Sequence, residues 1–156
     1  PLLTAFLKED GCRLLLEALA RHRSSVLLQD NGYYVLRLVG LQSLESRTRI
    51  AALDGFKVIL DGMRIHPQLV KVQTYASALL HDMMATDDQN RQAVGALGGV
   101  QDPLRSLRAH LTNPALVECA LAALQAVCLG SPEHSRELAG LQGLELITAS
   151  MRTHPN

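Results

Sequence analysis

The feature that most limits how this chain can fold is a repeat of 44 residues. Residues 59–67, ILDGMRIHP, return as ITASMRTHP at residues 147–155, and half of that 88-residue interval aligns the whole chain with itself. At this offset two residue types each recur four times, namely His22, His66, His110 and His154, and Gly11, Gly55, Gly99 and Gly143. Two independent coincidences of this kind indicate a repeat protein, in which each unit packs against its neighbours.

The offset divides the chain into units at residues 1–44, 45–88 and 89–132, with part of a fourth unit at residues 133–156. Apolar residues three and four positions apart predict a short helix, a corner at glycine, a second helix and a long third helix in each unit. Few aromatic residues and abundant Leu and Ala also favour packed helices. We therefore expect one all-α repeat array.

Residues 26–41 carry local signals that conflict with the repeat. Two apolar runs flank Asn31-Gly32, which is typical of a β-hairpin. At the 44-residue offset, however, Gly32 aligns with Ala76 and Ala120, which lie in clear helical patterns. The repeat therefore predicts a helix, in which a small residue lets a neighbouring helix approach closely.

Composition argues against several kinds of partner. Fifteen basic residues balance fifteen acidic ones, so no net charge directs the chain to nucleic acid or to an anionic membrane. No apolar run is long enough to span a bilayer. Cys12, Cys119 and Cys128 show no metal-ligand spacing and are expected to be free thiols in an intracellular protein, cytoplasmic or nuclear.

No catalytic or cofactor motif stands out. Ser131, His134 and Glu137 contain the residue types of a catalytic triad, but their closeness on one turn and helix favours helix capping. Asp87-Asp88 likewise predicts a cap or a solvated loop. The glycines match no phosphate-binding pattern. We expect no enzyme activity, no cofactor and no metal.

The aligned histidines and arginines predict structural roles. Equivalent atoms in stacked helical units lie roughly 8–10 Å apart, whereas ligands of one metal ion converge to about 2 Å from it. We therefore expect each helix-end histidine to contact backbone carbonyls or the following loop. Arg64, Arg108 and Arg152 also recur, and we expect solvated charges at helix ends.

Residues 90–100, NRQAVGALGGV, and residues 117–127, VECALAALQAV, resemble the armadillo repeat. A second copy is similar, with SRTRIAALDGFKVIL at residues 46–60 and MRIHPQLVKVQTYASALLHDM at residues 63–83. The resemblance extends over essentially the whole chain. HEAT repeats are the nearest alternative, but the short extra helix before each glycine favours the armadillo type.

The resemblance implies a right-handed α-α superhelix with three helices per repeat, whose third helices line a concave surface. Peptide-binding armadillo proteins carry a Trp and an Asn on each third helix. The Trp positions here are Tyr34, Ala78 and Ala122, and the Asn positions are Leu38, Asp82 and Ala126. Their replacement argues against importin-like binding of extended basic peptides. A helical or globular protein partner, or another domain of the same chain, fits better.

Three hypotheses of function follow. The first is a protein-protein interaction module or scaffold that binds through its concave face. The second is a regulatory repeat segment of a larger multidomain protein, for example one carrying a kinase, that packs on its own chain. The third, an enzyme in its own right, has the least support. Pro1 and a fourth unit without a long helix predict a piece of a longer chain, in which Leu144, Ile147 and Met151 cover the third unit and leave apolar surface outside.

Overall fold

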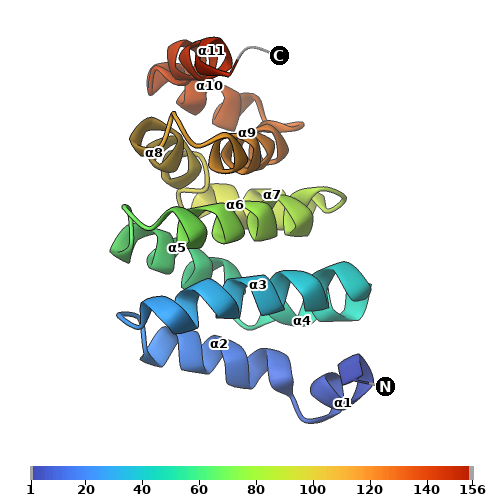
Figure 1. Cartoon of the computed structure of the whole chain (residues 1–156). Coiled ribbons are helices and arrows are strands. Elements are labelled where there is room, and N and C mark those ends of the chain that lie inside the picture. The colour runs from blue at the N-terminus through green and yellow to red at the C-terminus, as the bar shows by residue number, and fades with distance from the viewer. Residues whose placement is uncertain (1, 155–156) are drawn as a thin grey trace.

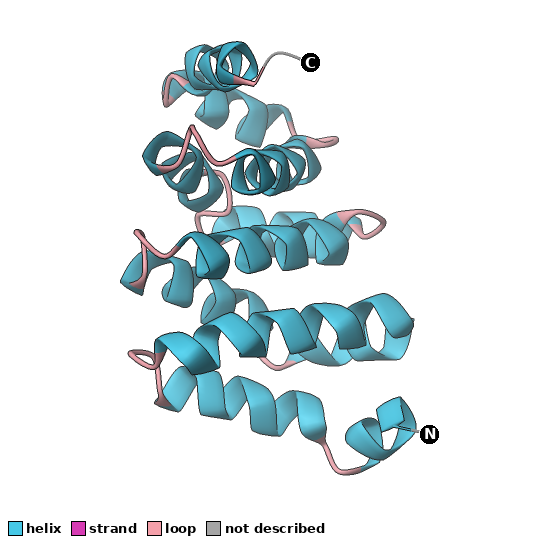
Figure 2. Cartoon of the chain, viewed as in Figure 1, coloured by secondary structure: helices cyan, strands magenta, loops and turns pink. Residues whose placement is uncertain are grey.

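The computed structural model describes residues 2–154, and the side chains of residues 4–154. Eleven helices fill most of this range, and none of its residues forms a β-strand (Figures 1 and 2). The prediction of an all-α fold is confirmed. The helices are α1 (Leu2–Lys8), α2 (Gly11–Arg21), α3 (Val26–Gln42), α4 (Leu44–Ala52), α5 (Gly55–Ile65), α6 (Val70–Met84), α7 (Asp88–Ala96), α8 (Gln101–Ala109), α9 (Pro114–Cys128), α10 (Pro132–Gly140) and α11 (Gly143–Thr153).

Two rows of helices run through the molecule. The long helices form one row, in which α3 packs on α6 and α6 packs on α9 (Figure 1). The helices that precede them form the second row, in which α2 contacts α5, α5 contacts α8 and α8 contacts α11. Each long helix also packs on the second-row helix before it, so side chains between the rows are enclosed.

Polar caps explain where many of the helices begin. The first backbone N–H groups of a helix have no acceptor within it, and a side-chain oxygen just before the helix satisfies one of them. The caps at Asp87 and Ser131 confirm the predicted capping roles of these two residues. The side chains that accept in this way are Ser25 for α3, Ser43 for α4, Asp87 for α7, Asn113 for α9 and Ser131 for α10.

Residues 26–42 form helix α3, so the repeat predicted their structure and the hairpin signal did not. Gly32 lies against Leu19 of α2, and a Cβ at Gly32 would stand 2.6 Å from Leu19 Cδ2. The predicted close approach at this small residue is therefore confirmed. Ala76 and Ala120, its equivalents, are fully buried.

The corner before each second-row helix differs from the expected one. At three corners the left-handed backbone conformation belongs to the residue before the glycine, namely Asp10 (φ 56°), Asp54 (φ 56°) and Gln142 (φ 59°). Glycine is needed for space instead, because a Cβ at Gly143 would stand 2.6 Å from the Leu138 carbonyl oxygen. A corner at glycine predicts that the glycine itself takes the left-handed conformation. This holds in the third unit, where Gly98 has φ 91°, and is corrected at the other three corners.

Helix α8 starts two residues earlier than predicted. Because proline is common at the first position of a helix, the sequence predicts a start at Pro103, but the helix begins at Gln101. Proline is tolerated in the first turn because the N–H that it lacks would have no acceptor within the helix.

Helix α11 agrees only in part with the expectation for the fourth unit, in which Leu144, Ile147 and Met151 were all to cover the third unit. Ile147 is half-buried and packs against the core, whereas Leu144 and Met151 are 59% and 66% exposed. Apolar side chains on this helix therefore cover the third unit on one side and face solvent on the other.

Candidate protein-binding surface

Four large apolar side chains lie on the outward side of α3. Leu27, Tyr34 and Leu41 are spaced by seven residues, and Leu38 lies between the last two, so all four share one side of the helix. They are between 42% and 73% exposed. We call these four residues the α3 stripe. Such a patch on a folded protein marks a surface suited to contact with another protein.

The predicted site residues on α6 and α9 are less accessible than those on α3. Tyr34 and Leu38 are exposed, while Asp82 and Ala122 are half-buried. Ala78 and Ala126 are each only 6% exposed. Their short side chains lie on long helices that pack on one another, so these two positions offer little accessible surface.

An aromatic pair joins the first two long helices. The rings of Tyr34 and Tyr75 have centroids 5.3 Å apart and are tilted by 52°. Tilted rings at this separation attract one another because the positive edge of one ring faces the negative face of the other. Tyr75 is a site residue that the sequence did not indicate, because it occupies the position of Asn31 rather than that of Tyr34.

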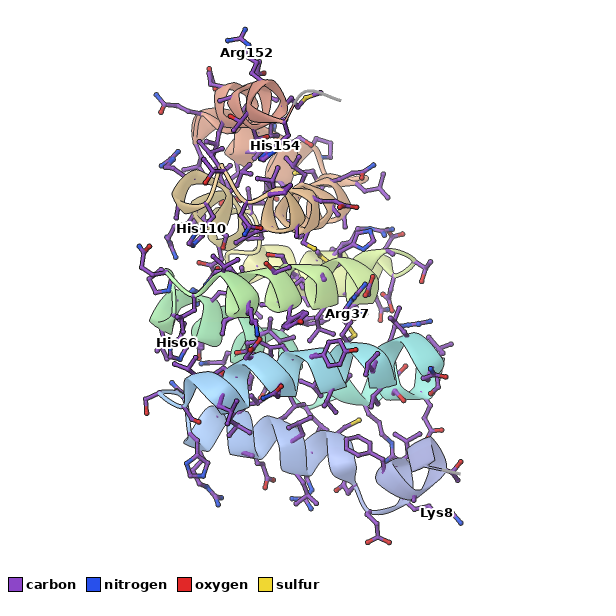
Figure 3. The ribbon with its side chains drawn as sticks, in the orientation of Figure 1. Lys8, Arg37, His66, His110, Arg152 and His154 are labelled. Carbon is purple, nitrogen blue, oxygen red and sulfur yellow. The ribbon has the colours of Figure 1, made fainter. Side chains whose placement is uncertain are left out.

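An ion pair lies beside the aromatic pair. Figure 3 labels Arg37 on α3. Its Nε donates to Asp82 Oδ2 on α6 at 2.6 Å, and His81 Nδ1 lies 3.1 Å from Asp82 Oδ1. The Asp82 carboxylate is mostly buried and the Arg37 side chain is about one-third exposed. Asp82 therefore links two helices, and only part of it is available to a partner.

Histidines join successive units on another side of the stack. His66 Nε2 donates to the Arg23 carbonyl at 2.6 Å, and His110 Nε2 donates to the Pro67 carbonyl at 2.8 Å. His154 Nε2 makes the third such bond, to the Leu111 carbonyl at 2.7 Å. The three side chains follow one another along the stack (Figure 3). The prediction that these histidines contact backbone carbonyls is confirmed.

The aligned arginines also bridge units, which corrects the expectation of merely solvated charges. Arg64 Nη2 donates to the Leu97 carbonyl at 2.5 Å and lies 2.7 Å from Asp102 Oδ2. Arg108 Nη2 donates to the Leu141 carbonyl at 3.2 Å. Both side chains are exposed, but their tips are bonded. Arg152, on the outermost helix, is exposed.

Two buried glutamines were missed by the sequence reasoning. Gln29 Nε2 donates to the carbonyls of Leu19 and His22 at 3.0 and 3.3 Å. Gln73 Nε2 makes the equivalent bonds, to Met63 and His66 at 2.8 and 2.9 Å. Each glutamine thus donates to carbonyls at the end of a second-row helix, where no backbone N–H of that helix is available to donate to them. The identity of Gln29 and Gln73 at the 44-residue offset was the available signal.

The residues considered for chemistry have other contacts. Ser131 Oγ accepts from the His134 backbone N–H at 3.2 Å, His134 Nδ1 donates to the Val127 carbonyl at 3.0 Å, and Glu137 accepts from Gln101. These contacts separate the three side chains of the supposed triad and make them helix caps and links. No group of three metal-binding side chains occurs within the described range.

The cysteines are free thiols, as predicted. Burial raises the pKa of the Cys12, Cys119 and Cys128 thiols, so each stays protonated at neutral pH. A protonated thiol is a poor nucleophile. Reactive-cysteine chemistry therefore has no support at these positions.

A surface hollow lies beside α7 and the connection between α9 and α10, and Arg91, His134 and Arg136 are among its lining residues. Arg91 Nη1 donates to the Met84 carbonyl at 2.6 Å, which caps the end of α6. His134 does the same for α9 through Val127. Two of the three basic groups are thus already used by the fold.

No protein-family model matches the chain, and searches of curated proteins and of solved structures also find no match. Within residues 2–154, no helix has the length and apolar character needed to cross a bilayer.

Proposed function

We propose that this protein is a protein-protein interaction module that binds its partner through the outward side of the long helices. Its units would form an armadillo-like superhelical array in which α3, α6 and α9 provide the concave face. The free, protonated thiols support a cytoplasmic or nuclear location.

The observation that carries this proposal is the exposure of the α3 stripe. Four large apolar side chains face solvent on one helix, next to the Tyr34–Tyr75 pair and the Arg37–Asp82 pair. Interfaces place apolar and aromatic anchors at their centre and polar groups around them. The α3 stripe and its neighbours have this composition.

The second candidate is a regulatory repeat segment that packs on another domain of its own chain, for example a kinase domain. The low exposure of Ala78 and Ala126, where peptide-binding armadillo proteins carry Trp and Asn, favours a folded surface over a thin extended peptide. That observation fits a partner in the same chain as well as one in a separate protein.

Capture experiments with matched variants test the proposal. Leu38→Asp and Leu41→Asp place a charge in the α3 stripe, and both positions are exposed enough to leave folding intact. Leu14→Asp, at an equally exposed leucine on α2, is the control. We expect proteins retained by the wild type in cell extract, and then rebound in purified form, to be lost with the stripe variants alone. Equal retention by all variants would reject the α3 stripe as the binding surface.

Any domain that flanks this segment in a longer protein can be used to distinguish the two candidates. Binding of a separately expressed flanking domain, weakened by Leu38→Asp, would favour the regulatory segment. Binding only to other proteins would favour the interaction module.

A further inference from the structure

We infer that Ser24, in the connection between α2 and α3, is a phosphorylation site for a serine/threonine kinase that selects arginine before its target. The inference concerns residues 21–25, RHRSS, which the proposed function does not use. It does not depend on the α3 stripe being a binding surface.

The residues before Ser24 carry the charge pattern that such a kinase recognises. Arg21 lies three residues before Ser24, and Arg23 directly precedes it. Kinases discriminate among substrates partly by charge pattern, and a guanidinium is bound well by carboxylates of the enzyme. Ser24 is the only serine or threonine of this sequence with an arginine three residues before it. The pattern therefore selects one hydroxyl of the chain.

The equivalent connections of the other units lack this pattern. Ser24 aligns with Gln68, which has no hydroxyl, and with Thr112, which has no arginine three residues before it. Thr74 follows a lysine by three residues, but it is half-buried within α6 and donates to a backbone carbonyl of its own helix at 2.8 Å. The pattern thus belongs to one connection and is not a general requirement of the repeat.

The connection is accessible to an enzyme. The side chains of Arg21, His22, Arg23 and Ser24 are all exposed. A kinase binds its substrate in an extended form, so this segment has to open locally. Opening breaks the bond from the Ser25 backbone N–H to the His22 carbonyl at 3.0 Å. None of residues 21–25 is buried, so a local opening here separates few contacts.

The folded structure offers partners for a phosphate on Ser24. Arg23 Nη1 lies 3.9 Å from Asp61 Oδ2, and the Arg23 side chain is 52% exposed, so this ion pair is loose. A phosphate can bind the same guanidinium through two parallel hydrogen bonds. It would also lie just before the first turn of α3, where the helix dipole favours negative charge. A modified Ser24 is therefore compatible with the fold.

The reaction is a phosphoryl transfer from ATP. Ser24 Oγ attacks the γ-phosphorus, the bond from that phosphorus to the β,γ-bridging oxygen breaks, and ADP leaves with the electron pair. The hydroxyl proton passes to a carboxylate of the kinase. The product carries a charge of about −1.5 to −2 three residues before Leu27, the first member of the α3 stripe. Phosphorylation would thus change the charge beside that surface.

Phosphorylation of the folded protein in vitro tests the inference. The protein is incubated with ATP and activated calcium/calmodulin-dependent protein kinase, which selects serines that follow an arginine by three residues. Mass spectrometry of proteolytic fragments locates the phosphate, and we expect it on Ser24. Arg21→Gln should lower the initial rate at least about tenfold, because it removes the charge that the kinase recognises.

Matched controls separate recognition from loss of structure. Arg152→Gln removes an exposed arginine of α11 and should leave the rate unchanged, whereas Ser24→Ala should abolish incorporation. Circular dichroism should show that these variants and Arg21→Gln remain folded. A synthetic peptide of residues 17–29 reports whether the kinase accepts the sequence outside the fold.

Three results would overturn the inference. The first is no phosphorylation of the folded protein, whether or not the peptide is modified. The second is incorporation mainly at a residue other than Ser24. The third is an equal rate for the Arg21→Gln and wild-type proteins.

Discussion

Helices α5 and α11 occupy the same place in their units, yet they differ in what surrounds them. Met63 of α5 is 3% exposed and its equivalent Met151 of α11 is 66% exposed. The two helices have the same residue at several equivalent positions, including Met63 and Met151, which are two 44-residue repeats apart. The difference in exposure therefore comes from the neighbouring helices rather than from the local sequence. Each unit of a repeat protein depends on adjacent units for its stability. The interior of the stack is therefore expected to be sensitive to substitutions that its outer helix tolerates.

The largest effect is expected from the methionine pair itself. Met63→Ala should lower the free energy of unfolding by about 2–5 kcal/mol, because it removes buried contacts and leaves a cavity. Met151→Ala should change it by less than about 0.5 kcal/mol, as at other surface positions. Urea unfolding monitored by circular dichroism measures both. Equal destabilisation by the two substitutions would contradict the expectation that α5 is more sensitive than α11.

A charged contact between units provides the second pair. The Asp102 carboxylate is buried and bound by Arg64 and Arg105, the latter donating at 2.8 Å. Asp102→Asn should cost about 1–3 kcal/mol, because the amide turns donors toward the arginines. Asp10→Asn changes an exposed pair with Arg13 and should cost at most about 1 kcal/mol. Thermal unfolding of the two variants compares these costs, and a larger effect at Asp10 would contradict the account.

The glycine corners provide a third test. At Gly55 a Cβ would overlap the Ile50 carbonyl oxygen, whereas at Gly140 it would meet no heavy atom within 4 Å. Gly55→Ala should therefore destabilise the protein by about 1–3 kcal/mol through overpacking. Gly140→Ala should leave stability unchanged or raise it slightly, because alanine favours a helix. Chemical denaturation reports both changes. A tolerated alanine at Gly55 would mean that the corner has room to relax.

The smallest effect is expected along the histidine row. His66→Ala removes the bond to the Arg23 carbonyl and should cost about 0.5–1.5 kcal/mol. His22 is the equivalent residue of the first unit, and its side chain is exposed with no acceptor among the described residues. His22→Ala should thus be nearly neutral. Differential scanning calorimetry resolves this difference, and a neutral His66→Ala would show that the bond between units adds nothing.

Much of the fold could be predicted because each segment could be compared with its equivalents at the 44-residue offset. The helix at residues 26–42 is the clearest case, since Gly32 was interpretable only beside Ala76 and Ala120. The histidine contacts also followed from the register, because their spacing excluded a shared metal ion. These inferences needed periodicity and distance but no knowledge of how units are oriented.

The candidate site was less predictable because it depends on that orientation. The pairing of Tyr34 with Tyr75 and the low exposure of Ala78 both arise from how closely α3 and α6 pack. The positions carried over from the armadillo resemblance predicted six surface residues. Of these, only Tyr34 and Leu38 are exposed, and the other four are buried or half-buried. The bonds of Arg64 were missed for the same reason, since their acceptors belong to the next unit.

Hydrogen-deuterium exchange tests most directly the claim that neighbouring units determine stability. Backbone amides exchange when a segment opens, so segments covered on both sides should be the slowest. We predict the strongest protection in α6, which packs between α3 and α9, and the weakest protection among the second-row helices in α11. Equal protection of α5 and α11 would contradict the account.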